Sequence, residues 1–296
     1  MDGSPVRSQQ VQAAEQQRLA NIADYFDRAT ADYRHWDAAL HMHFGYWRWP
    51  LSPFKRAAMV EQLSAEVHDR LGLMREAKGT ILDLGCGVGT SARQLAVSHP
   101  AVRVLGLSVS PMQVELGNRS SAKAKLGERV ELREADYRST TLASASVIGA
   151  YAIESACYDG ADGAGLIREA ARVLRPGARL IIADGFRRKL RVPWAARAVE
   201  RRMLAGWTLP RFNVLDRFNA NLRKHGFEIE ATRDISLRVL PSVLQVPLVS
   251  LVFRLREGFN LDERREGNAS APIWGLLCAL LWPRRFGYYL ITARRR

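Results

Sequence analysis

The chain has 296 residues, of which 47% are hydrophobic, so it can bury a full core and disorder is not expected over most of its length. Its formal net charge of +14 is compatible with an anionic partner, namely nucleic acid, a membrane surface or a phosphorylated substrate, and also with a solvated basic surface. The three cysteines form no Cys-x-x-Cys pair, which argues against a metal site or a disulfide framework and favours a cytoplasmic location.

The beginning of the chain divides into a polar segment, a helix and an aromatic segment. Residues 1–17 are polar and lack the apolar run of a signal peptide, and we predict that they are disordered. Within residues 11–36 apolar side chains recur every three or four positions, which predicts an amphipathic helix docked on an apolar surface. Residues 36–54 then gather six aromatic rings, two histidines and two prolines, a composition that predicts a loop. A helix over about 54–73 completes an N-terminal cap of residues 18–78.

The stretch TILDLGCGVGTS, residues 80–91, places glycines at alternate positions directly after a short apolar strand. Glycine permits tight turns at positive φ and lets a ligand approach bare backbone, so we expect a ligand to contact Gly85 and Gly87, with Asp83 beside it at the strand end. A dinucleotide-binding loop would read G-x-G-x-x-G with an acidic residue ~20 positions on, and a Walker loop would end in Gly-Lys-Ser/Thr. The sequence matches neither pattern, so NAD and a P-loop nucleotide are disfavoured.

Further apolar segments alternate with helical ones along the rest of the chain. We predict strands within residues 103–108, 130–136 and 146–158, then a helix, a Pro-Gly turn and a fifth strand within 169–186. A helix, a glycine stop and a sixth strand follow within 214–235, and a seventh strand within 285–295. Strands that alternate with helices at this rhythm predict a parallel, doubly wound sheet.

The segment ILDLGCGVGT and the ordered segments after it resemble motif I and the core of the class I S-adenosylmethionine-dependent methyltransferases, over roughly residues 20–235. The resemblance implies an α/β fold with a doubly wound, seven-stranded, Rossmann-like sheet, an N-terminal helical and aromatic cap, and a helical insertion before the last strand. We therefore expect one methyltransferase domain over residues 18–296, with its core sheet in 79–235 and 286–293.

About 50 residues separate the sixth and seventh predicted strands, where the family core needs only a tight hairpin. We expect residues 237–285 to form an apolar lid, because this segment contains the runs VLQVPLVSLVF and APIWGLLCALLW, each too short to span a bilayer. A substrate tunnel, a contact with a membrane surface and ordinary core helices are all open alternatives for this insertion.

By the same resemblance, S-adenosylmethionine should lie on the glycine loop, with its ammonium group near Asp83 and its adenine near Asp136. The Asp or Glu that usually binds the ribose hydroxyls is replaced by Ser-Val-Ser in GLSVSPMQ, a segment similar to that of cyclopropane fatty acid synthases and tocopherol methyltransferases. This similarity assigns the ribose to Gln113 and to the backbone near Ser108. The cofactor-binding residues that we expect are Tyr25, Asp83, Gly85, Gly87, Ser108, Val109, Gln113, Ala135, Asp136 and Tyr137.

The segment after the fourth predicted strand distinguishes classes of methyl acceptor. Amino methyltransferases of DNA and RNA carry Asn/Asp-Pro-Pro-aromatic at this place, and 5-methylcytosine enzymes need a Pro-Cys, whereas this chain reads YAIESACY. Nucleic acid is therefore not expected as a substrate. YAIESACY instead resembles the corresponding stretch of sterol side-chain methyltransferases and prenyl diphosphate C-methyltransferases, and in that resemblance Glu154 faces cofactor and substrate.

An alkene that attacks the methyl group leaves a carbocation, which a carboxylate stabilises by charge and aromatic rings stabilise by cation–π attraction, before a base removes a proton. The expected catalytic residues are Glu154, His43 and Tyr46, and the expected substrate-binding residues are Phe44, Trp47, Tyr158 and Trp207.

The leading expectation is C-methylation of an isoprenoid alkene. The alternative is O- or N-methylation of an aromatic or quinone-like metabolite, with His43 as the base, and a non-catalytic protein that binds S-adenosylmethionine or RNA also stays open. The expected partner is a hydrophobic small molecule, with or without a diphosphate, and no metal is expected. A peripheral membrane contact and the oligomeric state are left open.

Overall fold

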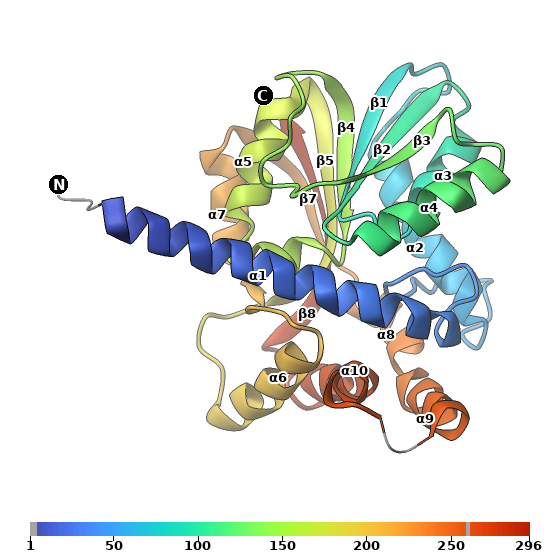
Figure 1. Ribbon diagram of the computed structural model, residues 1–296, viewed down its shortest axis with the longest axis vertical. Coiled ribbons are helices and arrows are strands. Elements are labelled where there is room, and N and C mark those ends of the chain that lie inside the picture. Colours follow the sequence, from blue (N-terminus) through green and yellow to red (C-terminus); the bar gives the residue numbers. More distant parts are fainter. Residues whose placement is uncertain (1–4, 259–260) are drawn as a thin grey trace.

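The computed structural model describes residues 5–258 and 261–296, and within them the strands form a single eight-stranded sheet (Figure 1). Its order is β3-β2-β1-β4-β5-β8-β7, and the short strand β6 pairs with β5. The strands are β1 (Gly79–Leu84), β2 (Val102–Ser108), β3 (Val130–Glu134), β4 (Val147–Ile153), β5 (Leu174–Arg187), β6 (Asn213–Val214), β7 (Phe227–Asp234) and β8 (Phe286–Arg295).

Strands β1 to β5 run parallel, and β8 enters antiparallel between β5 and β7. This is the doubly wound α/β sheet that the sequence predicts, so the predicted fold class is confirmed. The expectation of seven strands was one short, because β6 has only two residues and carries no periodicity that a sequence pattern can reveal.

Two hydrophobic clusters cover the two faces of the sheet. One cluster joins the sheet to α5 (Ala164–Val173) and α7 (Leu215–Lys224), and the other joins it to α2 (Arg56–Arg70) and α3 (Thr90–Ser98). The helix α4 (Pro111–Lys123) packs along β3. Because both faces are covered, the parallel strands have nearly continuous apolar sequences. Because these strands run in the same direction, their carboxyl ends lie at one edge of the sheet.

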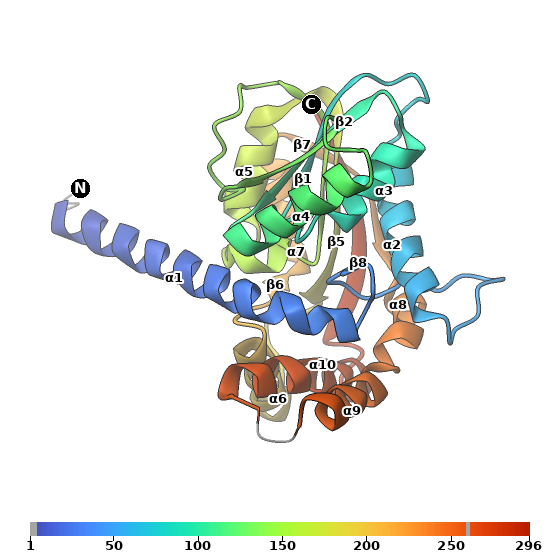
Figure 2. The same ribbon diagram turned by 45° about the vertical axis from the view of Figure 1, so that its right-hand side comes forward.

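Helix α1 (Pro5–Asp32) lies across that edge, and its first half extends away from the body (Figure 2). Residues 5–17 are therefore helical, and the prediction of disorder for them was wrong; residues 1–4 of that predicted segment lie outside the described residues. Residues 6–32 contain neither glycine nor proline, which allows an unbroken helix. Glu15 on α1 also forms ion pairs with Arg18 and with Arg138 of the body, which ties the helix down.

The remaining helices gather beyond the same edge (Figure 2). They are α6 (Trp194–Gly206), which follows β5, and α8 (Ser236–Val243), α9 (Val246–Glu257) and α10 (Glu263–Leu281), which fill the segment between β7 and β8. Together α8 and α9 make a helical stretch of 22 residues, Ser236–Glu257, which contains an 18-residue window with a mean hydropathy of 1.6, and 33% of that window is buried. By length and composition alone this stretch could cross a membrane. The sequence prediction considered each apolar run separately and found it too short, because the sequence gives no sign that the two helices join end to end.

Helices α6 and α10 meet through a pair of glycines. A Cβ on Gly206 would collide with the Gly267 carbonyl oxygen and would lie 2.8 Å from the Cβ of Ala271. The two helix backbones therefore approach closely, and the contact tolerates no side chain at this position.

We expect Gly206→Ala to destabilise the protein by ~1–3 kcal/mol, because the added methyl forces the two backbones apart. Gly127→Ala is the matched control: its Cβ would lie 3.6 Å from the nearest atom, an ordinary contact. Urea unfolding of both variants measures the difference. Equal unfolding midpoints for the two variants would contradict the close helix contact.

Candidate active site

A cavity of about 500 Å³ lies at the carboxyl ends of the parallel strands. The glycine loop, the aromatic loop before α2, and helices α1, α6, α8 and α10 all contribute to its wall. Most of the residues predicted for the site line this cavity: Asp83, Gly85, Gly87, Ser108, Val109, Gln113, Asp136, Tyr137, His43, Phe44, Glu154, Tyr158 and Trp207.

The glycine loop connects β1 to α3 and exposes backbone to the cavity. Gly85, Gly87 and Gly89 have φ values of 88°, 53° and 71°, respectively, all in the left-handed region. A Cβ at Gly85 would collide with Ser155, and one at Gly87 would lie 3.3 Å from Met42 Sδ. The loop therefore needs glycine both for its conformation and for the close approach of its neighbours.

Asp83 is the last residue but one of β1 and is 2% exposed. The Tyr151 hydroxyl donates a hydrogen bond of 2.8 Å to its Oδ2 atom. Burial raises the pKa of Asp83 to about 7, although the bond from Tyr151 acts in the opposite direction. A cationic ligand group beside Asp83 would favour the ionised form, so the carboxyl group suits an ammonium.

The end of β2 carries a hydrogen-bond chain that reaches α1. Ser108 Oγ donates to Gln113 Oε1 at 2.7 Å, and Gln113 Nε2 donates to Thr30 Oγ1 at 3.2 Å. The Ser110 hydroxyl donates to Asp27. Asp27 thus brings a carboxylate from α1 to the end of β2, where the strand's own sequence has none. The sequence analysis missed Asp27 because it lies 83 positions before Ser110.

Asp136, which the resemblance assigns to the adenine amine, already has a partner within the chain. Arg138 donates to both of its carboxylate oxygens over 2.8–3.1 Å, and the same guanidinium pairs with Glu15 of α1. The neighbouring Tyr137 donates from its hydroxyl to the Ser155 carbonyl at 2.9 Å. The structure places Asp136 in the cavity wall but with its carboxylate held by arginine.

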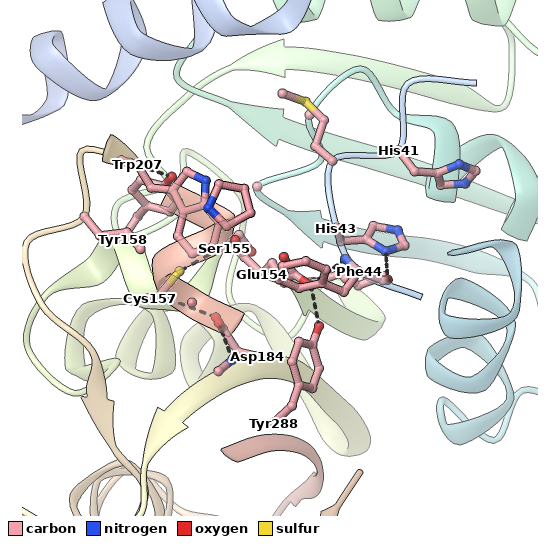
Figure 3. A pocket seen from close by; sticks show the side chains of 18 of the residues that line it. His41, His43, Phe44, Glu154, Ser155, Cys157, Tyr158, Asp184, Trp207 and Tyr288 are labelled. Carbon is pink, nitrogen blue, oxygen red and sulfur yellow. Dashed lines mark hydrogen bonds between the residues drawn. The ribbon is translucent and has the colours of Figure 1, made fainter. Parts of the chain in front are cut away.

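Glu154 follows β4 with a φ of 50° and faces the middle of the cavity (Figure 3). Its Oε1 atom accepts a 2.7 Å bond from the Phe44 N–H and a 2.8 Å bond from the Tyr288 hydroxyl. Burial raises the pKa of Glu154 to about 8, against the opposing effect of these two hydrogen bonds. The carboxyl group can therefore hold or release a proton near neutral pH.

Two residues beside Glu154 were not found from the sequence. Tyr288 comes from β8, and an alternating strand pattern does not reveal which side chain will reach a distant carboxylate. Asp184 lies in β5 directly after the last residue that pairs with β4, accepts from the N–H groups of Cys157 at 3.0 Å and Gly185 at 2.7 Å, and is 3% exposed. Burial raises the pKa of Asp184 to about 7. Its place near the carboxyl end of the fifth predicted strand was the signal that could have identified it.

His43 lines the cavity, but both of its ring nitrogens are occupied. Nδ1 lies 2.8 Å from the Phe44 carbonyl oxygen and Nε2 lies 3.3 Å from Ser64 Oγ. Burial lowers the pKa of His43 to about 3. A ring with no free nitrogen and little basicity is poorly suited to remove a proton, which disfavours the predicted role of His43 as base.

Four of the predicted residues lie outside the cavity lining. Tyr25 is buried and donates to Asn268 Oδ1 at 2.8 Å, and Ala135 packs on the core while its N–H bonds Ser108. Tyr46 packs against the other core cluster, and Trp47 donates to the Leu51 carbonyl. These rings were predicted from their clustering in sequence, but successive residues of an extended loop point to opposite sides, so only part of the cluster faces the cavity.

Aromatic rings and apolar helix side chains form the wall beyond Glu154 (Figure 3). Phe44 and Trp207 lie 6.4 Å apart between ring centroids, and the Tyr158 hydroxyl donates to the Trp207 carbonyl at 2.9 Å. The apolar part of this wall includes Met203, Val239, Val243, Gly275, Cys278 and Ala279. Such a wall suits a hydrophobic ligand.

Three comparisons with known proteins bear on this site. A family profile described as a methyltransferase domain matches residues 81–177. The chain is 35% identical to 27-O-demethylrifamycin SV methyltransferase of Amycolatopsis mediterranei, over 68% of this chain and 72% of that protein. It is 32% identical to methyltransferase GfsG of Streptomyces halstedii, over 92% of this chain and 93% of that protein.

Among solved structures, geranyl diphosphate C-methyltransferase of Streptomyces coelicolor is similar in fold, with a TM-score of 0.71, 19% identity, and coverage of 94% of this chain and 98% of that chain. The chain also matches fungal O-methyltransferases, of which it spans 51–63% of the length. The 19% identity to the geranyl diphosphate C-methyltransferase is so low that the similarity to that structure concerns the fold alone.

The raised pKa of Glu154 predicts how stability depends on pH. Its carboxyl group has a pKa of 4.5 as the reference value and about 8 in the folded protein, so between these pH values the folded state binds more protons and stability falls as pH rises. Glu154→Gln keeps the acceptor oxygen and cannot ionise. Between pH 5 and pH 8.5 the free energy of unfolding of the variant should therefore rise by more than about 1 kcal/mol relative to that of the natural chain.

Urea unfolding at several pH values measures this change, with Glu128→Gln as the same substitution at an exposed position. The same pH trend in both variants, or a loss of relative stability for Glu154→Gln as pH rises, would contradict the burial of an ionisable Glu154.

Proposed function

The chain belongs to the S-adenosylmethionine-dependent methyltransferases, and we propose that it methylates a hydroxyl group of a hydrophobic small molecule, with Glu154 as the proton acceptor. The observation that carries the proposal is the carboxyl group of Glu154, whose pKa of about 8 lies near neutral pH and whose surroundings are otherwise largely apolar. A general base works best when its pKa is close to the pH at which it acts.

The residues present fit the cofactor. Gly85 and Gly87 leave bare backbone, Asp83 offers a buried carboxyl group to an ammonium, and Ser108 with Gln113 offers polar groups to hydroxyls. When bound, S-adenosylmethionine supplies an electrophilic methyl group on a sulfonium. We propose these residues as its binding site, with Val109 and Tyr137 as further wall contacts.

Glu154 has the geometry of a base that is held in place. The Phe44 N–H and the Tyr288 hydroxyl both bond Oε1, which fixes the orientation of the carboxyl group and leaves Oε2 for another partner. We propose that Oε2 takes the proton of the acceptor hydroxyl. The apolar wall excludes water, which keeps the proton transfer between acceptor and carboxylate.

An oxygen acceptor is preferred to a carbon acceptor because the relative from Amycolatopsis mediterranei is, by its name, an O-methyltransferase, and because it is 35% identical. C-methylation of an isoprenoid alkene is the second candidate. The rings of Phe26, Tyr33, Phe44, Tyr158 and Trp207 favour it, since they line the cavity and could stabilise a carbocation by cation–π attraction.

We further propose that α8, α10 and α1 act as the cover of the acceptor site. Side chains of all three helices line the cavity, and they follow one another around the edge of the sheet. In this proposal the described residues of the insertion, 237–258 and 261–285, act as the lid that the composition predicts. A cover of this kind holds the acceptor near Glu154 and away from solvent.

Incubation of the enzyme with CD₃-labelled S-adenosylmethionine and a panel of lipophilic alcohols, phenols and isoprenoid alkenes tests the acceptor. We expect product carrying the label as a methoxy group, identified by mass spectrometry and NMR. Glu154→Gln should lower turnover by ~10² or more and leave the Kd of the cofactor within about twofold, with Glu128→Gln as control.

Label found on carbon would replace the oxygen proposal by the alkene one. Turnover of Glu154→Gln equal to that of the natural enzyme would remove Glu154 from the chemistry in either case.

The cofactor site is tested by Gly87→Val. Its branched side chain would stand in the cavity at the position proposed for the cofactor, so S-adenosylmethionine affinity should fall by ~10² or more. Gly177→Val is the matched control, because Gly177 has a φ of 81°, has no atom within 4 Å of its Cβ and lies away from the cavity, so it carries the same backbone strain. Calorimetric titration that gave equal affinity for the two variants would contradict the site.

A further inference from the structure

The exposed face of α6 carries aromatic and basic side chains together. Trp194, Arg197 and Arg201 follow one another at intervals of three and four residues, so they lie on one face of the helix. All three are exposed, and Trp194 is 79% exposed. A hydrophobic cluster that contains Ala196 of α6 and Cys278 of α10 holds the helix against the body from the other side. The exposed face therefore belongs to a helix that is fixed in place.

Two loops extend this face beyond the start of α6. The Arg285 guanidinium donates to the Arg191 carbonyl at 3.3 Å, and the Arg188 N–H donates to the Arg285 carbonyl at 2.7 Å. These bonds hold the loop between β5 and α6 against the turn between α10 and β8. The two loops add three exposed cations and two exposed leucines, namely Lys189, Arg191, Arg284, Leu190 and Leu281. We call these five residues, together with Trp194, Arg197 and Arg201, the basic–apolar patch.

The sequence around the patch supplies almost no acidic residue to balance its cations. Residues 188–212 contain one, Glu200, which is 1% exposed and accepts a hydrogen bond from Arg187. Residues 267–296 contain none. The five cations of the patch form no ion pair within the part of the chain that the structure describes. The patch therefore has a positive local field, which attracts an anionic surface and repels the same patch on a second copy of the chain.

We propose that the basic–apolar patch docks the protein on an anionic membrane surface. Its cations are attracted to the negative charge of the lipid headgroups, and Trp194 and the two leucines enter the interface between headgroups and acyl chains. Tryptophan suits this depth because its ring is apolar and its N–H is polar. A nucleic acid also attracts cations, but its phosphate backbone offers the leucines no apolar contact, whereas a lipid surface accommodates both kinds of side chain.

The outer layer of helices offers the membrane further apolar contact. Leu248, Leu251 and Leu255 of α9 are exposed and lie on one face of the helix, at intervals of three and four residues. Helix α10 packs against both α6 and α9, so the three helices form one layer beyond the edge of the sheet (Figure 2). Apolar side chains that are spread over several helices suit a lipid surface better than a protein partner, which would bind mainly at a few clustered residues.

The patch lies next to the cavity at the end of α10. Leu280 lines the cavity and is 48% exposed, and the next residue, Leu281, belongs to the patch. Docking through the patch therefore places the cavity wall at the membrane surface. If the acceptor is lipophilic, as the proposed function states, it reaches the enzyme from the bilayer. The docking itself does not depend on the methyl transfer.

Sedimentation of the full chain with lipid vesicles tests the docking, without cofactor or acceptor. Vesicles of phosphatidylcholine alone are compared with vesicles in which one third of the lipid is phosphatidylglycerol. The natural chain should bind the anionic vesicles about tenfold or more tightly than the neutral ones, because each cation of the patch adds attraction to the charged surface. Added salt should weaken the binding, because it screens this attraction.

The double variant Arg197→Glu, Arg201→Glu should lower the partition coefficient on anionic vesicles about tenfold or more. The matched control is the double variant Arg103→Glu, Lys123→Glu, which makes the same change in net charge. Arg103 near the start of β2 and Lys123 at the end of α4 are both exposed and lie toward the amino ends of the strands, away from α6. The control should bind both kinds of vesicle as the natural chain does.

Trp194→Ser tests the apolar part of the contact. It should lower the partition coefficient on anionic vesicles about threefold or more, because the indole ring no longer enters the interface. Met74→Ser is the matched control, since Met74 is 75% exposed and lies in the loop before β1, at the opposite edge of the sheet. Trp194, Arg197 and Arg201 do not line the cavity, so the variants leave its wall intact.

Equal binding to neutral and anionic vesicles, or equal losses in the patch variants and their controls, would overturn the proposal. Vesicle binding that Trp194→Ser leaves unchanged, and that soluble polyglutamate displaces completely, would also overturn it, and would assign the patch to a soluble anionic partner. A failure to dock would leave the methyltransferase function standing, because vesicle binding is measured without cofactor or acceptor. The two failures are therefore distinguishable.

Discussion

The hydrogen bonds at the Glu154 carboxyl group join three parts of the chain that are far apart in sequence. The Phe44 N–H comes from the aromatic loop before α2, the Tyr288 hydroxyl comes from β8, and Glu154 itself directly follows β4. One carboxyl oxygen thus sets the position of the loop relative to the sheet. The position of this loop in the cavity wall depends on the contact, because Phe44, His41 and His43 belong to the same loop and all three line the cavity.

Three carboxyl groups in or beside the cavity have pKa values near neutral because burial disfavours their charge. Asp83 and Asp184 have values of about 7, and Glu154 has a value of about 8. A cationic ligand lowers such values, and by linkage the ionised carboxylates bind the cation more tightly. The basic composition of the chain therefore says little about the cavity, whose charge is set locally by buried acids.

The sequence was sufficient for the parts of the structure that depend on local patterns. The glycine loop, the order of β1 to β5 and the aromatic loop each have a spacing or composition that elementary rules interpret, and Gly85, Gly87 and Glu154, which the sequence assigns to the site, line the cavity. Their roles in binding and chemistry stay predictions.

The rest of the site depends on contacts between distant segments. Tyr288 of β8 bonds Glu154, and Asp27 of α1 bonds Ser110 after β2, and no periodicity in their own segments indicates these partners. His43 and His41 are two residues apart with the same composition around them, yet only His41 keeps a free nitrogen, because Ser64 of α2 happens to meet the other ring. Side-chain partners of this kind follow from the packing of helices and loops, which the sequence pattern does not specify.

The glycine contact between α6 and α10 has a consequence for how such an acceptor pocket diversifies. The two helices are insertions at different places in the chain, one after β5 and one before β8, and both lend side chains to the acceptor wall. A side chain at Gly206 would collide with α10, and a Cβ on Gly267 would lie 3.2 Å from Gly206 Cα. A foreign helix that carries a bulkier residue at the crossing therefore fits only if its partner helix moves with it. New acceptor specificity should therefore be transplanted as a pair of segments, while the sheet and the glycine loop stay unchanged.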